Sequence, residues 1–204
     1  MKQYPSIPRR VDHDTPVYVF PKYDGSNVRA EWSRKKGWHL FGRRRGLLDG
    51  SHPILSAHAQ RLMMETYGDD LARVFRARRW DRAVAFFEFF GPGSFAGVHR
   101  PDDDHEVMLI DVSLHRRGLL EPDAFLGAFQ GLKLPPVLHH GPLTPAMVAQ
   151  VQAGAFPGQT AEGIVAKGPY KTPGRPLAFK VKARSWLDTL RASCATEVEF
   201  IRRR

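Results

Sequence analysis

The sequence has very little cysteine and no long apolar segment. Its single cysteine, Cys194, cannot form an internal disulfide, and no group of Cys and His residues has the spacing of a zinc site. No stretch approaches the roughly 20 apolar residues that cross a bilayer, and no apolar signal segment follows Met1. We therefore expect a soluble, cytoplasmic protein with no membrane contact and no structural metal.

Acidic residues are also few relative to basic ones. The 204 residues include 21 Asp and Glu against 31 Lys and Arg, which gives a net charge of +10. This imbalance predicts an acidic partner, and nucleic acid is the commonest partner of such a chain. With 42% hydrophobic residues the chain can also bury a substantial core.

Strand patterns alternate with a few helical patterns along the chain. Residues 1–16 are polar and punctuated by proline, which predicts an extended surface arm. Residues 28–33 alternate as a half-buried strand does, and Thr144-Pro145 and Ser185 are predicted to begin helices, Ser185 as a capping residue with Asp188. We expect strands at 17–20, 28–33, 38–41, 83–87, 107–110, 163–166 and 177–181, and helices at 55–67, 71–78, 122–129, 146–153 and from 185. The pattern predicts an α+β fold with mostly antiparallel sheets.

One lysine follows the first predicted strand at a proline bend. Taken alone, Lys22-Tyr23-Asp24-Gly25 is typical of an exposed turn with a solvated ion pair. Further motifs follow it in a fixed order: Gly42-Arg43-Arg44, Phe87-Glu88-Phe89-Phe90-Gly91, Leu109-Ile110-Asp111, Glu162-Gly163-Ile164-Val165-Ala166-Lys167 and Phe179-Lys180-Val181-Lys182. Each is weak by itself, but their joint order is specific.

These motifs resemble those of the covalent nucleotidyltransferases, the superfamily of ATP-dependent DNA ligases, RNA ligases and mRNA capping enzymes. The resemblance covers residues 17–182. It implies a ligase-type, ATP-grasp-like fold in which two antiparallel sheets flank a nucleotide pocket. The expected domain spans residues 1–184, and residues 185–204 form a short helix and basic tail.

The resemblance assigns Lys22 as the nucleophile that attacks the α-phosphate of ATP and forms lysyl-AMP. Attack needs a neutral amine, and lowering a lysine pKa from about 10.4 by roughly 3 units costs about 4 kcal/mol. Burial and nearby cations act in that direction. Lys180 and Lys182, two apart on a strand, share a face and are expected to stabilise charge on the α-phosphate.

The remaining site residues are assigned by the resemblance as well. Glu162 would help to hold Mg²⁺ or Mn²⁺, since magnesium takes few protein oxygens. Glu88 would bind the ribose, and Arg43 the ribose or a 5′-phosphate. The other expected nucleotide-binding residues are Asp24, Gly25, Asn27, Ile110, Val165 and Lys167; for Lys167 an exposed strand end is the alternative.

The sequence departs from the family pattern at three points. Phe20-Pro21 stands where many members have a glutamate, and Ile110 where an aromatic residue often stacks on the base. An apolar sandwich of Ile110 and Val165 could hold adenine instead. Only 22 residues follow Lys182, too few for the oligonucleotide-binding barrel of DNA ligases and capping enzymes.

The short tail and Asn27 favour an RNA ligase among the family members. Its substrates would be RNA ends, or DNA ends, that carry a 5′-phosphate and a 3′-hydroxyl, and a partner protein could replace the missing appendage. A minimal DNA or nick ligase and a guanylyltransferase are the alternatives, followed by a non-catalytic nucleotide- or RNA-binding module. The sequence does not indicate an oligomeric state.

Overall fold

The chain forms two compact units in a computed structural model, which describes residues 2–43, 46–48, 50 and 54–203. The larger unit consists of Met1–Ser6, Gly25–Pro135 and Tyr170–Pro176. The smaller unit consists of Ile7–Asp24, Pro136–Pro169 and Leu177–Arg204. The sequence pattern did not indicate this division, and the expected boundary after residue 184 stays a prediction.

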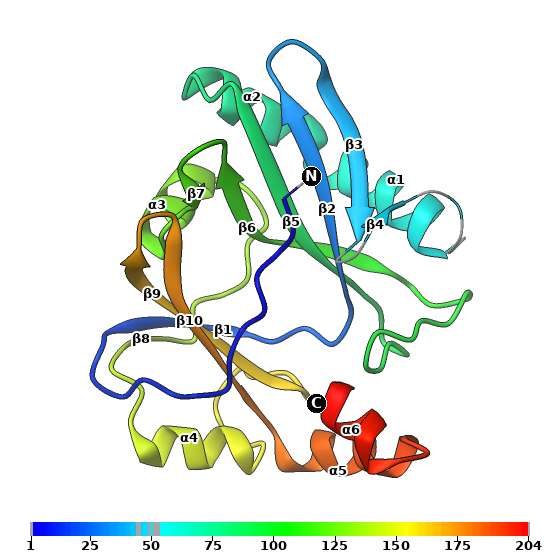
Figure 1. Cartoon of the computed structure of the whole chain (residues 1–204), viewed down its shortest axis with the longest axis vertical. Helices are drawn as coiled ribbons and strands as arrows, with labels where there is room; N and C mark the ends of the chain where they lie inside the picture. Colours follow the sequence, from blue (N-terminus) through cyan, green and yellow to red (C-terminus); the bar gives the residue numbers. More distant parts are fainter. Residues whose placement is uncertain (1, 44–45, 49, 51–53, 204) are drawn as a thin grey trace. The chain divides into compact units, whose positions relative to one another are not determined.

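The larger unit is built on a six-stranded antiparallel sheet of strand order β4-β3-β2-β5-β6-β7 (Figure 1). Its strands are β2 (Ser26–Ser33), β3 (Gly37–Arg43), β4 (Gly46–Leu47), β5 (Arg82–Phe90), β6 (Glu106–Leu114) and β7 (Gly118–Leu119). The predicted hairpin of β2 and β3 is present, with Ala30 paired to Phe41. Long β-branched and aromatic runs in β5 and β6 explain why these strands pair over their whole length.

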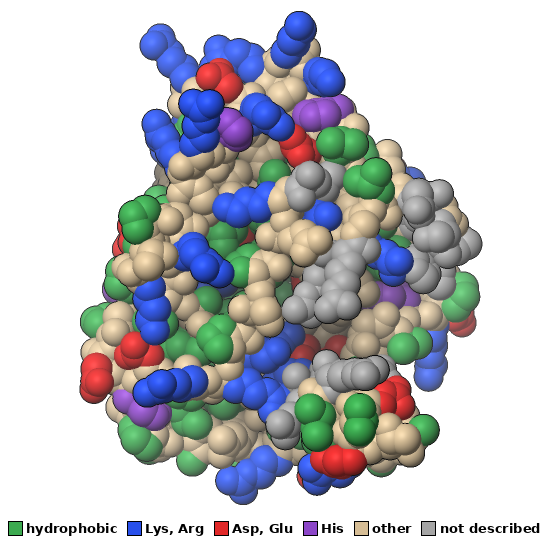
Figure 2. Space-filling model, in the orientation of Figure 1, with side chains coloured by type: hydrophobic (Ala, Val, Ile, Leu, Met, Phe, Trp, Pro, Cys, Tyr) green, Lys and Arg blue, Asp and Glu red, His purple; other side chains and the backbone are tan. Residues whose placement is uncertain are grey.

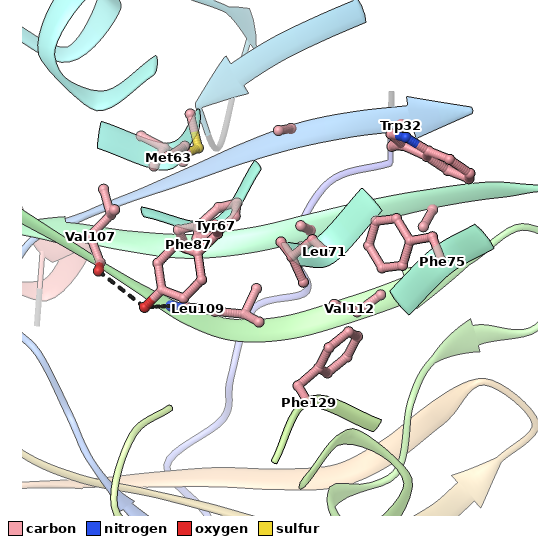
Figure 3. Close-up of a cluster of buried hydrophobic side chains, with 14 of the residues drawn as sticks. Trp32, Met63, Tyr67, Leu71, Phe75, Phe87, Val107, Leu109, Val112 and Phe129 are labelled. Carbon is pink, nitrogen blue, oxygen red and sulfur yellow. Dashed lines mark hydrogen bonds between the residues drawn. The ribbon is translucent and has the colours of Figure 1, made fainter. Parts of the chain in front are cut away.

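Helices pack against one face of this sheet. They are η1 (Ile54–Ala59), α1 (Gln60–Met63), η2 (Met64–Gly68), α2 (Asp69–Ala77) and α3 (Pro122–Phe129). The predicted helix at 55–67 exists, but η1 and η2 are π-helical turns. Figure 3 shows the resulting core, in which Tyr67, Phe87 and Phe129 are at most 1% exposed. Each large side chain buried in this way contributes about 1.5–3 kcal/mol.

Strand β2 departs from its predicted half-buried pattern. Val28, Ala30 and Trp32 face the core as expected, but Arg29 and Glu31 on the other face are only 3% and 6% exposed. The Glu31 carboxylate accepts a 2.9 Å hydrogen bond from Arg82, so polar pairing allows the second face to be covered.

The smaller unit contains a four-stranded sheet of order β10-β9-β1-β8. Its strands are β1 (Val17–Pro21), β8 (His139–Gly141), β9 (Gly163–Thr172) and β10 (Arg175–Lys182), and its helices are α4 (Pro145–Gln152), α5 (Arg184–Ser193) and α6 (Glu197–Arg203). The end of β9 and the start of β10, from Tyr170 to Pro176, belong to the larger unit. Thr144 caps α4 as predicted, because its hydroxyl accepts a hydrogen bond from the Met147 amide. The predicted Ser185 cap is wrong: α5 begins at Arg184, and Ala183 precedes it without a side-chain cap.

Two further expectations concern the ends and surfaces of the chain. Residues 2–16 form no helix or strand, as predicted for an extended arm. Within the described ranges, no helix combines the length and hydropathy needed to span a membrane. Figure 2 shows many Lys and Arg side chains and few acidic ones on the face it presents, in keeping with the net charge of +10.

Candidate active site

Lys22 directly follows β1 in the smaller unit, and hydrogen bonds fix both its backbone amide and its backbone carbonyl. Its amide donates a 3.0 Å hydrogen bond to the Gly163 carbonyl, and its own carbonyl accepts one from the Thr160 hydroxyl. Its Nζ lies 2.9 Å from Glu162 Oε2, and the side chain is 20% exposed. The lysine is therefore a positioned, partly buried group, and the exposed-turn alternative is wrong.

Glu162 lies just before β9 and joins two of the predicted lysines. Its Oε1 receives Lys182 Nζ at 2.8 Å, while Oε2 receives Lys22. Glu162 is only 4% exposed, so the ion pairs offset the large cost of burying its charge. Both oxygens of the predicted metal ligand thus contact ammonium groups.

The two lysines of β10 lie on one face of the strand, as their spacing predicted. Phe179, which precedes Lys180, and Val181, which lies between the two lysines, pack into the core of the smaller unit. Burial and the neighbouring Lys182 lower the pKa of Lys180 to about 8. Burial also lowers the pKa of Lys182, although the Glu162 carboxylate opposes that change.

Charge in this cluster is out of balance. Lys182, Lys22 and Arg9 all act on Lys180 as like charges, whereas the Glu162 carboxylate acts on it with the opposite charge. Repulsion among cations in a partly buried place costs free energy, and an anionic group would relieve it. The lysine cluster has the electrostatics of a phosphate site.

Asp24 has a partner that the sequence did not reveal. Trp186 Nε1, in the first turn of α5, donates a 2.6 Å hydrogen bond to Asp24 Oδ2. The Lys182 ammonium lies 3.7 Å from the centre of the same indole ring, a close cation–π contact. Trp186 therefore links the loop after Lys22 to the end of β10.

Two more predicted residues lie on β9 in the smaller unit. Val165 pairs with Phe20 of β1. The Phe20-Pro21 segment, which differs from the family pattern, is therefore part of the sheet. Lys167 Nζ lies 5.4 Å from the centre of the Phe20 ring. The side chain is partly buried, which disagrees with the alternative of an exposed strand end.

The other predicted residues belong to the larger unit, namely Gly25, Asn27, Arg43, Glu88 and Ile110. Asn27 of β2 lies directly opposite Glu88 of β5. A Cβ on Gly25 would come within 2.1 Å of the Phe89 carbonyl oxygen, so only glycine fits there. Arg43 pairs with Val28 at the end of β3, and Arg44 of the same motif lies outside the described residues.

Ile110 occupies a β-bulge that the sequence did not predict. Phe86 pairs with Asp111 and Phe87 with Leu109, so Ile110 is an additional residue in β6. Bulges turn side chains to a new direction and are common beside functional sites. Ile110 packs with Phe86 on the sheet face opposite the main core.

The N-terminal arm reaches this same sheet face through Tyr4. Its hydroxyl donates a 2.5 Å hydrogen bond to Asp111 Oδ2, and its ring centre lies 5.1 Å from that of Phe86. Burial, then Asp111, then Glu88 raise the pKa of Tyr4 well above its usual range. Nothing in the polar arm except the presence of one aromatic residue indicated this role.

Metal ligands are sparse. Among the residues that the structure describes, no three His, Cys, Asp or Glu side chains are grouped to hold a metal ion. A Mg²⁺ bound through one carboxylate and substrate phosphates needs no such group. Glu162, a buried carboxylate beside Lys22 and Lys182, is the residue that could supply that one ligand.

Comparison with known proteins finds similarity in structure. No protein-family model matches the sequence, and no curated protein matches it. An archaeal ATP-dependent RNA ligase has 18% identity and a TM-score of 0.64, covering 95% of this chain and 51% of its own. An apo mutant of the Naegleria gruberi RNA ligase has 12% identity and a TM-score of 0.61, covering 93% and 60% respectively.

Further structures of the Naegleria gruberi enzyme match as well. One mutant with AMP and Mn has 14% identity and a TM-score of 0.58, and it covers 92% of this chain and 59% of its own. The chain thus spans about half to three fifths of the proteins it resembles. At these identities the similarity establishes the fold.

Proposed function

The chain has the fold of a ligase-type nucleotidyltransferase domain, and from this premise we propose that it is an ATP-dependent RNA ligase. The observation that carries the proposal is the lysine cluster, in which Lys22 and Lys182 share the carboxylate of Glu162. Lys180 adds a further cation, and burial together with the neighbouring cations lowers its pKa. Such a cluster suits a nucleophilic amine beside a triphosphate.

In the proposed first step, the Lys22 amine attacks the α-phosphate of ATP. A P–N bond forms, the bond to pyrophosphate breaks, and lysyl-AMP remains. The amine must first lose its proton to water, and the ion pair with Glu162 at 2.9 Å opposes that loss until the contact is broken. Lys180 and Lys182 balance the charge that develops on the phosphate.

Glu162 is the residue that would hold a divalent metal. Mn accompanies ATP or AMP in structures of the Naegleria gruberi RNA ligase. Bound Mg²⁺ or Mn²⁺ would neutralise phosphate charge. To hold a metal, Glu162 would give up one of its two lysine contacts, and loss of the Lys22 contact would free that amine from its ion pair.

The other residues of the sequence motifs are proposed to contact the nucleotide. Glu88 accepts a hydrogen bond from the ribose, and Arg43 contacts the ribose or a 5′-phosphate. Ile110 and Val165 supply apolar contacts to adenine, and Lys167 a phosphate contact. Asp24, Gly25 and Asn27 shape the backbone around Lys22 and β2, with Asp24 fixed by Trp186.

In the second and third proposed steps, AMP moves to the 5′-phosphate of a strand, and a 3′-hydroxyl then displaces it. The net charge of +10 supports a nucleic acid as the substrate. RNA is proposed over DNA because the matched structures are RNA ligases. The match covers 51% to 60% of these ligases, so the acceptor is tested directly.

The test is incubation with α-labelled ATP or GTP and Mg²⁺, followed by a denaturing gel. We expect label on the protein from ATP, none from GTP, and none on Lys22→Ala. The labelled protein is then offered 5′-phosphorylated RNA and DNA, nicked and single-stranded. Label from GTP alone would indicate a guanylyltransferase, transfer to DNA alone a DNA ligase, and no label at all a binding module.

A further inference from the structure

The larger unit contains a groove that no residue of the proposed active site lines. It has a volume of about 930 Å³ and lies where β5 and β6 meet the β6–β7 turn and the β9–β10 turn. We call it the basic groove, after the cations that line it: Lys2, Arg82, Arg116, Arg117, Lys171 and Arg175. All of them belong to the larger unit.

The cations of the basic groove are nearly uncompensated. The lining contains one carboxylate, Glu31, which is already paired with Arg82 at 2.9 Å. Within the described part of the chain, the other five cations form no ion pair. Burial and then the nearby Arg175 lower the pKa of Lys2, so Lys2 and Arg175 are close enough to repel each other. An anionic ligand would remove that repulsion.

A buried hydroxyl lines the same groove without a partner. Ser113 of β6 is 2% exposed, and its Oγ has no hydrogen-bond partner among the residues described. A buried hydroxyl left unpaired costs about 1–3 kcal/mol, and such groups commonly serve a ligand or water. This group can donate a hydrogen bond to an anion in the groove.

The wall of the groove is a specific close contact between two turns. Gly118 and Gly174 have φ values of +85° and +71°, and the Leu119 amide donates a 3.1 Å hydrogen bond to the Gly174 carbonyl. A Cβ on Gly118 would lie 2.3 Å from the Gly174 oxygen. Only glycine permits this approach, which brings Arg117 and Arg175 to the two sides of the contact.

We propose that the basic groove binds the phosphodiester backbone of an RNA strand. Its size and its row of cations exceed what one phosphate needs, whereas consecutive phosphates of a strand match several separate cations. Ser113 would bond a phosphate oxygen. RNA as the occupant rests on the proposed function, while the anion site itself rests on the charges and the unpaired hydroxyl.

The test measures binding of a fluorescent single-stranded RNA without a 5′-phosphate, by anisotropy at several salt concentrations. The variant combines Arg116→Ala, Arg117→Ala and Arg175→Ala. We expect the affinity for RNA to fall about tenfold or more. We also expect the slope of log K against log salt to become shallower by about 2, because each of the three lost phosphate contacts contributes about 0.7 to the slope. Melting curves check that the variant folds.

The matched control removes three other cations of the larger unit: Arg61→Ala, Arg73→Ala and Lys133→Ala. Each of these is exposed and paired with a carboxylate, so the net charge changes equally outside the groove. We expect the control to bind RNA within about twofold of wild type. Equal losses of RNA affinity in both variants would contradict the proposal that the groove binds RNA, because only the net charge of the protein would then determine affinity.

The active site and the basic groove fail in distinguishable ways. The groove variant should take label from ATP on Lys22 at the wild-type rate. If the wild-type protein is not labelled by ATP but the groove variant still loses RNA affinity, the ligase proposal is wrong and the proposal of an RNA-binding groove is supported. If the wild-type protein is labelled and the groove variant binds RNA normally, only the proposal of an RNA-binding groove is wrong. Tighter groove-dependent binding of the same sequence as DNA would overturn RNA as its occupant.

Discussion

At the scale of single residues, Glu162 determines the state of the candidate nucleophile. Lys22 is ion-paired in this structure, and an ion pair favours the charged amine. Neighbouring cations act in the opposite sense, as the sequence led us to expect. In the proposed reaction, loss of the Glu162 contact would therefore free the amine for attack.

Lys182→Ala should slow formation of lysyl-AMP about 10²- to 10³-fold, the usual effect of removing one preorganised charge-stabilising donor. It also leaves one Glu162 oxygen without its lysine. Single-turnover labelling with ATP measures the rate. Lys171→Ala, which removes an exposed lysine of β9, is the control and should label normally. A near-normal rate for Lys182→Ala would remove it from the catalytic set.

Lys180→Met should stabilise the protein by about 1–2 kcal/mol below pH 8, less than the full pKa change implies because the amine is partly solvated. With a pKa of about 8 when folded and 10.5 as the ordinary value, Lys180 is charged in both states below pH 8, where its charge destabilises the fold. Between these values the folded state loses its proton first and the penalty disappears.

Urea unfolding at several pH values measures this difference. The advantage of Lys180→Met should shrink as pH rises from 8 towards 10.5. Lys35→Met, at an exposed hairpin turn, should change stability by less than about 0.5 kcal/mol. A difference between Lys180→Met and wild type that does not vary with pH would show that the partly buried charge of Lys180 is not its cause.

Sequence reasoning identified residues of the site better than their contacts. The shared face of Lys180 and Lys182 follows from strand periodicity alone. The hydrogen-bond partners of Lys22 and Asp24 lie 140 and 162 positions away, and Asp111, which bonds Tyr4, lies 107 positions away. Periodicity is a local signal, so such contacts could not be derived from it.

At the scale of elements, Gly163 controls how β9 starts beside β10. Its φ is +127°, and a Cβ there would lie 2.2 Å from the Val181 carbonyl oxygen. Gly163→Ala should therefore destabilise the protein by about 3 kcal/mol or more, measured by chemical denaturation. The change also displaces Glu162, so labelling of Lys22 should fall with it.

Gly127→Ala is the matched control for that prediction. Gly127 lies inside α3, is exposed, and has no atom within 4 Å of an added Cβ. Alanine should stabilise this helix by about 0.5–1 kcal/mol, because glycine loses more backbone entropy on folding. Equal effects of the two substitutions would contradict the close contact at Gly163.

Elements themselves were largely predictable, whereas their irregularities were not. Helix α3 occupies its predicted residues, and the strands pair as antiparallel sheets. The π-helical turns η1 and η2 and the bulge at Ile110 depend on packing and strand register, which no local pattern encodes. The capping pattern at Ser185 failed because the helix starts one residue earlier.

At the scale of the whole molecule, the net charge could be predicted from the sequence, but the positions where positive charge concentrates could not. The excess of ten positive charges follows from composition. Its concentration in the basic groove and around Lys180 depends on which turns and strands meet. The division into two units likewise leaves no trace in the sequence as a linker or a change of composition.

The central claim is that Lys22 becomes covalently adenylated, and peptide mass mapping after incubation with ATP and Mg²⁺ tests it most directly. The account predicts one adenylate group per chain on the peptide that contains Lys22, lost on acid treatment as expected of a P–N bond and absent from Lys22→Ala. An adenylate on another residue, or one that persists in Lys22→Ala, would contradict it.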